Sequence, residues 1–137
     1  MRLQTIIDTI KYAFTQPTIN TTLLESASVL NTQTSTDYSV AVIDLLNSTF
    51  DEDSLTASFR VYLLDRSNTN EVYGGAVSKW DWATDAFVTA FSRLVNNDSL
   101  TGVRFGQINY VLNDFADLLC GGICDIDLTI PMAVECV

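Results

Sequence analysis

A chain of 137 residues with a hydrophobic fraction of 47% has the size and the apolar content of one domain with a substantial core. Its formal charge of −10 and its seven scattered Lys and Arg residues exclude tight binding to nucleic acid or to an anionic membrane, because both need several cations on one surface. No stretch is apolar for long enough to span a membrane, and with no signal peptide apparent we expect synthesis in a cytosol.

The N-terminal third of the chain predicts one short helix. The segments that follow it do not clearly favour strand or loop. Residues 1–14 place their apolar side chains on one face at helical spacing, and Pro17 prevents this helix from running on. Residues 18–24 are rich in Thr and Ile and fit a short strand. Residues 25–37 are mostly Ser, Thr and Asn, and they fit either a loop or a strand that the pattern does not reveal.

The next two apolar segments predict a β-hairpin. Residues 38–46 are β-branched and almost wholly apolar, so we expect a strand that is covered on both faces. Residues 47–54 contain the acidic run Asp51-Glu52-Asp53 and predict the hairpin turn. Residues 55–64 alternate apolar and polar side chains and predict the return strand.

A helix over residues 78–97 is the longest regular element that the sequence predicts. Its apolar residues recur at three-then-four spacing, which is typical of one helical face. Ser78 and Asp81 can form a capping pair at its start, and Asn96-Asn97 can close its end. The apolar face needs a sheet to cover it. It consists of Trp80, Ala83, Phe87, Val88, Phe91, Leu94 and Val95.

Two further strands complete the predicted architecture. They cover residues 103–112 and residues 124–136, with a loop over 113–122 between them. Pro131 falls inside the second pattern, which indicates an edge strand or a bulge. The order of elements predicts one α+β domain over residues 1–137. Its sheet is mostly antiparallel and packs against one long helix and a shorter N-terminal helix.

The sequence offers little for catalysis. It has no His, which removes the commonest general base and the usual activator of a Ser or Cys nucleophile. It also has no Gly-rich phosphate loop. Cys120, Cys124 and Cys136 are expected to be free thiols rather than a metal or redox site. We therefore predict a protein that is not an enzyme and that has no cofactor and no metal.

Two groups of carboxylates leave an alternative open. Asp51, Glu52 and Asp53 could hold a divalent cation, although three adjacent acids more simply form a solvated turn. Asp125 and Asp127 share one face of a strand and could hold a cation or form a catalytic pair, although a solvent-facing row is the simpler interpretation. A metal-dependent enzyme built on these carboxylates is the least favoured hypothesis.

One tryptophan is a candidate for contact with a partner. Trp82 projects from a different side of its helix than Trp80, and indoles concentrate in interface hot spots. An ordinary core or rim position is the alternative. The chain as a whole is apolar and yet strongly acidic, so it can stay in solution by charge while keeping apolar surface for assembly. That combination favours a subunit of a larger object over a free enzyme.

Three segments of the chain carry a resemblance to a known family. DYSVAVIDLLN, SFRVYLLDRSNTNEV and FADLLCGGICDIDLTIP, with the long helix between the second and the third, resemble small virion proteins of crAss-like bacteriophages and related phages of Bacteroidetes. The resemblance covers residues 38–137, and residues 25–36 have no place in it. The order of elements also resembles the tail-terminator fold of tailed phages. The positions that match the pattern are Asp65, Asn68, Asn70, Asp117, Gly121 and Pro131.

The resemblance implies a structural virion protein of the neck or tail-terminator position. Such a protein is made in the host cytoplasm and forms a homo-oligomeric ring, commonly six- or twelve-fold, between portal or neck proteins and tail proteins. Double-stranded DNA passes through the ring without specific binding, and a negative lumen would repel its phosphates. The turn Asp51-Glu52-Asp53 is thus the candidate lumen-facing site. The alternative is a small acidic regulatory or protein-binding module without catalytic activity.

Overall fold

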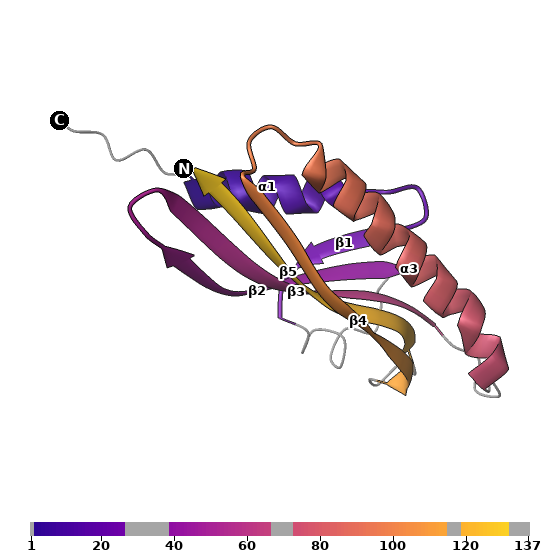
Figure 1. Cartoon of the computed structure of the whole chain (residues 1–137). Helices are drawn as coiled ribbons and strands as arrows, with labels where there is room; N and C mark the ends of the chain where they lie inside the picture. Colours follow the sequence, from indigo (N-terminus) through magenta and orange to yellow (C-terminus); the bar gives the residue numbers. More distant parts are fainter. Residues whose placement is uncertain (1, 27–38, 67–72, 115–118, 132–137) are drawn as a thin grey trace.

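The computed structural model describes residues 2–26, 39–66, 73–114 and 119–131 (Figure 1). These residues form two helices and five strands, in the order α1 (Arg2–Ala13), β1 (Thr21–Leu24), β2 (Val40–Phe50), β3 (Ser54–Arg66), α3 (Tyr73–Val95), β4 (Gly102–Asp114) and β5 (Leu119–Pro131). The predicted α+β class is confirmed, and so is each predicted helix and strand in its approximate place.

The five strands form one mixed sheet in the spatial order β1-β2-β3-β5-β4. Only β1 and β2 run parallel, whereas every other neighbouring pair is antiparallel. The expectation of a mostly antiparallel sheet is therefore confirmed. The strand β5 comes after β4 in the sequence but lies between β3 and β4, so β4 is an edge strand of the described sheet.

Both helices pack on the same face of the sheet. One hydrophobic cluster joins the buried side chains of α1 and α3 to those of β2, β3 and β5. Phe14, just after α1, meets Phe87 of α3 edge-on, with ring centroids 5.8 Å apart. The other face of the sheet carries no helix among the described residues. Its buried side chains form a smaller cluster, which consists of Val40, Val42, Leu64, Val111 and Leu119.

Small residues let α3 lie close to the sheet. Ala83, Ala86 and Ala90 of the helix are buried, and Gly122 of β5 lies next to Ala83 and Phe87. A Cβ atom on Gly122 would stand 3.0 Å from Cγ2 of Ile108 and 3.4 Å from Cβ of Ala83. The contact between α3 and β5 therefore has no room for a side chain at Gly122.

Two polar side chains tie α1 to α3. The buried Gln16 donates from Nε2 to the carbonyl oxygens of Ala13 (2.9 Å) and Ala86 (3.0 Å), so one amide joins both helices. Arg93 of α3 donates from Nη1 to the carbonyl oxygen of Thr15 (2.8 Å), just beyond the end of α1. A cation at this position complements the negative end of a helix dipole.

The boundaries of α3 differ from the prediction at one end. The helix begins at Tyr73, so Ser78 and Asp81 lie inside it and do not cap its start. Periodicity missed the first turn because that turn contains a Gly-Gly pair, which is more typical of a loop. At the other end the helix stops at Val95. The two asparagines that follow close it as predicted, since their N–H groups bond back to the last turn.

Two predicted loops are partly strand. The strand β2 runs on to Phe50, so the hairpin turn covers only residues 51–53 rather than 47–54. Gly121-Gly122 was expected in a loop but lies within β5. A Cβ atom on Gly121 would fall on the carbonyl oxygen of Leu63 in β3, so this glycine permits a close approach of two strands.

Pro131 does not mark an edge strand. It is the last residue of β5, an internal strand, and it pairs with Ser54 of β3. The ladder between β5 and β4 starts only at Thr129, so Pro131 stands outside that ladder. The expected continuation over residues 132–136 lies outside the described residues, as does most of the segment 25–37.

Candidate functional site

The acidic turn predicted at Asp51-Glu52-Asp53 joins β2 to β3, and its three side chains are exposed. Oδ1 of Asp51 accepts hydrogen bonds from the backbone N–H of Asp53 (2.8 Å) and of Ser54 (2.9 Å). These two donors lower the pKa of the Asp51 carboxyl below its ordinary value. The carboxylate of Asp51 thus stabilises the turn by accepting these hydrogen bonds. The carboxylates of Glu52 and Asp53 are the ones that the turn presents to its surroundings. Whether this turn faces a channel stays a prediction.

Trp82 lies at the rim of the core. It is half-buried, and its Nε1 donates to the carbonyl oxygen of Thr18 at 3.1 Å. Its ring packs against the main hydrophobic cluster and borders a shallow depression that also includes Pro17 and Arg93. The side chain therefore holds the segment after α1 onto α3. Its contact with a partner stays a prediction.

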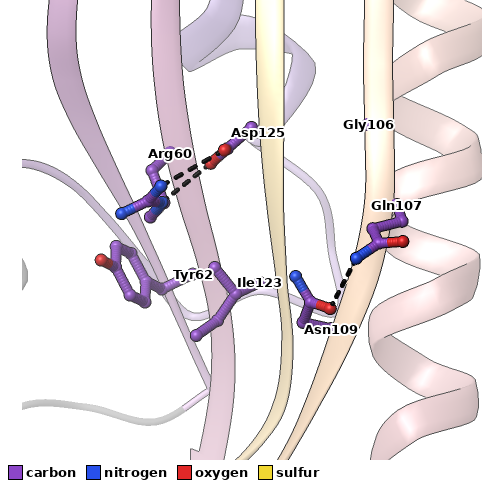
Figure 2. A pocket seen from close by; sticks show the side chains of 7 residues that line it. All are labelled: Arg60, Tyr62, Gly106, Gln107, Asn109, Ile123 and Asp125. Carbon is purple, nitrogen blue, oxygen red and sulfur yellow. Dashed lines mark hydrogen bonds and ion pairs between the residues drawn. The ribbon is translucent and has the colours of Figure 1, made fainter.

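A polar groove of about 490 Å³ lies on the helix-free face of the sheet (Figure 2). At one side Arg60 of β3 makes a two-pronged ion pair with Asp125 of β5, in which Nε and Oδ1 are 2.8 Å apart and Nη2 and Oδ2 are 3.3 Å apart. Hydrogen bonding to Asp125, together with the charge of its carboxylate, raises the pKa of Arg60 above its ordinary value. At the other side Gln107 donates to Asn109 at 3.3 Å.

The groove does not assemble a recognisable catalytic or metal centre. The carboxylate of Asp125 is taken up by Arg60, so Asp125 and Asp127 do not form a matched pair despite sharing this face. No group of three or more Cys, Asp or Glu side chains suited to a metal ion is found among the described residues. The groove can offer hydrogen bonds to a polar molecule, but its guanidinium and its two carboxamides already have partners within the chain.

The thiols lie inside the sheet. Cys120 and Cys124 of β5 are buried and take no part in a disulfide, as expected, and Cys136 lies outside the described residues. Burial, with a smaller effect of the charge on Asp125, raises the pKa of the Cys124 thiol to about 11. Cys124 is therefore a protonated thiol at neutral pH, which makes it a poor nucleophile and a poor metal ligand.

The positions that carried the family resemblance do not gather into one site. Asp65 of β3 forms an ion pair with Lys79 of α3, in which Oδ2 and Nζ are 2.9 Å apart. Gly121 allows the close approach of β5 to β3, and Pro131 ends β5. The remaining three positions, Asn68, Asn70 and Asp117, lie outside the described residues.

Neither models of known protein families nor curated proteins match this sequence. Neither described helix combines the length and the apolar character that crossing a lipid bilayer requires. On the surface of the chain, two exposed apolar features stand out beside the polar groove.

An apolar hollow of about 170 Å³ lies between α3 and β4, and we call it the α3–β4 hollow. Phe91 and Phe105 meet edge-on within it, with ring centroids 5.2 Å apart. The helix side of the hollow belongs to an exposed strip of α3, in which Val88 is 61%, Phe91 40% and Val95 54% exposed. The hollow is lined by Phe87, Val88, Phe91, Phe105, Gly106 and Ile108.

The exposed strip corrects the sequence analysis, which assigned Val88, Phe91 and Val95 to the buried face of the helix. Those three residues follow one another at helical spacing and are apolar, so the pattern alone could not separate them from the core. They stay exposed because they lie on the side of α3 next to β4, where the described sheet ends. No further strand among the described residues covers them.

The two edges of the described sheet are unlike each other. On one side β4 is an edge along its length. On the other side β1 pairs only with Val40–Ile43 of β2, which are buried as predicted. Asp44–Phe50 pair with β3, but no strand among the described residues lies along their outer edge. Phe50, at the end of this free half, is 73% exposed. The sequence pattern does not reveal Phe50 as an exposed strand residue, because the residues around it are polar and predict a turn.

Proposed function

We propose that this chain is a structural subunit of a homo-oligomeric ring in the neck or tail-terminator position of a tailed bacteriophage. The observation that carries the proposal is the presence of two unlike open edges, β4 and the outer half of β2, at opposite sides of one sheet. A subunit that joins its neighbour through two different surfaces associates head to tail, and such association gives a ring when the rotation closes.

The strand directions support head-to-tail association. Neighbouring strands alternate in direction from β2 through β3 and β5 to β4, so β2 and β4 run in opposite directions. When a second subunit follows in the same orientation, its β2 runs antiparallel to the first subunit's β4. The sheet can thus continue from copy to copy without a break in its pattern, and both helix layers stay on the same side.

The charge of the chain supports a place around DNA. A ring of subunits that each carry a formal charge of −10 repels the phosphates of a duplex that passes through it. The outward acids of the hairpin turn, Glu52 and Asp53, are the candidates for lining the channel. Portal or neck proteins on one side and tail proteins on the other are the proposed neighbours in the virion.

Mass spectrometry of purified virions tests the proposal, with copies of this chain counted against the portal protein. We expect a copy number of six or twelve for each particle. Absence from the particle would contradict the proposal and leave the alternative, a small acidic module that binds one soluble partner. Cryo-electron microscopy of the same particles then tests the channel, since an acidic turn on the outer wall would remove its assigned role.

A further inference from the structure

We propose that Phe50 of one copy inserts into the α3–β4 hollow of the next copy, while the outer half of β2 in the first copy pairs along β4 in the second. This inference rests on the proposed function, because it names the contact that would join subunits of the ring. It explains two unpartnered apolar features at once, a protruding aromatic side chain and an apolar hollow at the opposite edge.

Phe50 and the hollow lie on the same side of the sheet. Phe50 pairs in register with Leu55, whose side chain packs against the core under the helices. Phe105 and Ile108 of β4 point to that same side, since they pack against the same core and line the hollow with α3. When the sheet continues from β4 to the β2 of a neighbour, Phe50 therefore arrives on the side where the hollow opens.

The size of the hollow fits one phenyl ring. Its volume is about 170 Å³, and its wall consists of Phe and aliphatic side chains together with Gly106. An apolar cavity of about 150 Å³ is large enough to bind benzene. The exposed edges of Phe91 and Phe105 offer an incoming ring the edge-to-face contacts that aromatic pairs favour.

The short strand β1 fixes how the two strands must be displaced. With no displacement, Phe50 of the neighbour would lie level with the start of β4, and the neighbour's β1 would overlap the far half of β4. A shift of the neighbour towards Asp114 moves β1 past the end of β4. The same shift, of about six positions, brings Phe50 level with Ile108, which lines the hollow. The arrangement without overlap is thus also the one that fills the hollow.

Charge complementarity supports the same arrangement. Arg104 of β4 is exposed on the helix-free side opposite Asp127 of β5, and it has no hydrogen bond or ion pair within the described part of the chain. In the shifted register the residues after Phe50 lie level with Arg104, so Glu52 and Asp53 of the neighbour come within reach of its guanidinium. The interface between two subunits of a ring extends from its outer surface to its channel. A turn at this interface can therefore also border the channel.

Engineered cysteines test the contact in the full-length chain. We expect the pair Phe50→Cys and Val88→Cys, in a Cys136→Ser background, to form disulfide-linked multimers under mild oxidation. Phe50 and Val88 lie near opposite edges of the sheet, so a disulfide between them joins two copies. The matched control replaces Val88→Cys by Val77→Cys, eleven positions and about 16 Å away on the same helix. A ladder of multimers from the first pair and monomer from the second is the expected result.

Sedimentation measurements supply the affinity. We expect Phe50→Ser to weaken self-association about 10- to 100-fold, which is the range for losing the burial of one Phe side chain. Tyr12→Ser, which alters a side chain of similar exposure on α1, should leave self-association unchanged. Equal ladders from the two cysteine pairs, no ladder from either, or an unchanged affinity of Phe50→Ser would each overturn the inference.

The two proposals fail separately. A copy number of six or twelve in virions, combined with a Phe50→Ser variant that associates normally, would keep the ring and discard this contact. Self-association that depends on Phe50, in a chain that is absent from virions, would keep the contact and discard the phage role.

Discussion

Two sides of α3 are similarly apolar in sequence, but one is buried and the other is exposed. The inner side, with Ala83, Phe87 and Leu94, is buried against β5 and β3. The outer side, with Val88 and Phe91, is as apolar but stands beside an edge strand and remains exposed. The difference teaches that helical periodicity identifies an apolar side chain but not its partner, because the width of the sheet beneath the helix decides which residues are covered.

The largest effect should come from a matched pair of phenylalanines on the two sides. Phe87→Ala removes a fully buried ring and should lower the free energy of unfolding by about 3–5 kcal/mol. Phe91→Ala should cost clearly less, because 40% of that side chain is already exposed, and should instead weaken self-association. Urea denaturation followed by circular dichroism measures the first effect. Equal losses of stability in the Phe87→Ala and Phe91→Ala variants would contradict the difference in burial between the two sides of α3.

A glycine tests how tightly the inner side is packed. Gly122→Val would force a branched side chain between Ile108 and Ala83, and we expect a loss of about 1–3 kcal/mol from overpacking. Gly106→Ala is the control on β4, since the nearest atom to its new Cβ is a carbonyl oxygen at 3.4 Å, an ordinary contact. Thermal unfolding of both variants gives the comparison. A Gly122→Val protein as stable as wild type would mean that α3 can move away from the sheet freely.

The amide that joins α1 to α3 should have a smaller effect. Gln16→Leu keeps most of the volume but removes the donor to Ala13 and Ala86, so we expect a loss on the order of 1 kcal/mol. Gln4→Leu on the exposed side of α1 should change the stability little. A double variant with Phe87→Ala shows whether the two contacts are coupled, since a sum of independent losses would mean that they are not.

The smallest effect should appear at the hairpin turn and depend on pH. The folded state lowers the pKa of Asp51 below its ordinary value of 3.8, so the ionised carboxylate stabilises the turn above that pH. The contribution should fade as the pH falls below 3.8 and through the lowered pKa. Wild type and Asp51→Ala should therefore differ slightly in stability near neutral pH and converge in acid. A constant difference from neutral pH down to strong acid would contradict this role.

The elements of the fold could be predicted from the sequence, but their neighbours could not. Alternation of Cys124, Ile126 and Leu128 indicated a half-buried strand, and that strand is present. Pro131 wrongly suggested that it was an edge, because the rule for proline concerns the loss of a ladder bond and the ladder with β4 ends before Pro131. The edge is β4, a fact that depends on strand order rather than on any local pattern.

The candidate contact surfaces were the hardest part to predict. Acidity and turn chemistry placed Asp51-Glu52-Asp53 in a turn, and the structure agrees. Phe50, one residue earlier, was assigned to the same turn because its neighbours are polar. Trp82 was singled out by residue type, yet its indole is bonded within the chain. Exposure depends on where the chain returns in space, and a single sequence read locally does not carry that information.

The position of β5 has a consequence for how the chain acquires its structure during synthesis. Every pair along β3 and β5 joins residues far apart in sequence, from Arg66 with Leu119 to Ser54 with Pro131. On the ribosome β3 is translated well before β5, which separates it from β4, whereas β4 comes only shortly before β5. Until residues 119–131 emerge, both strands keep an open side. Completion of the sheet therefore waits for the last described strand, and the high contact order of this pairing favours slow folding.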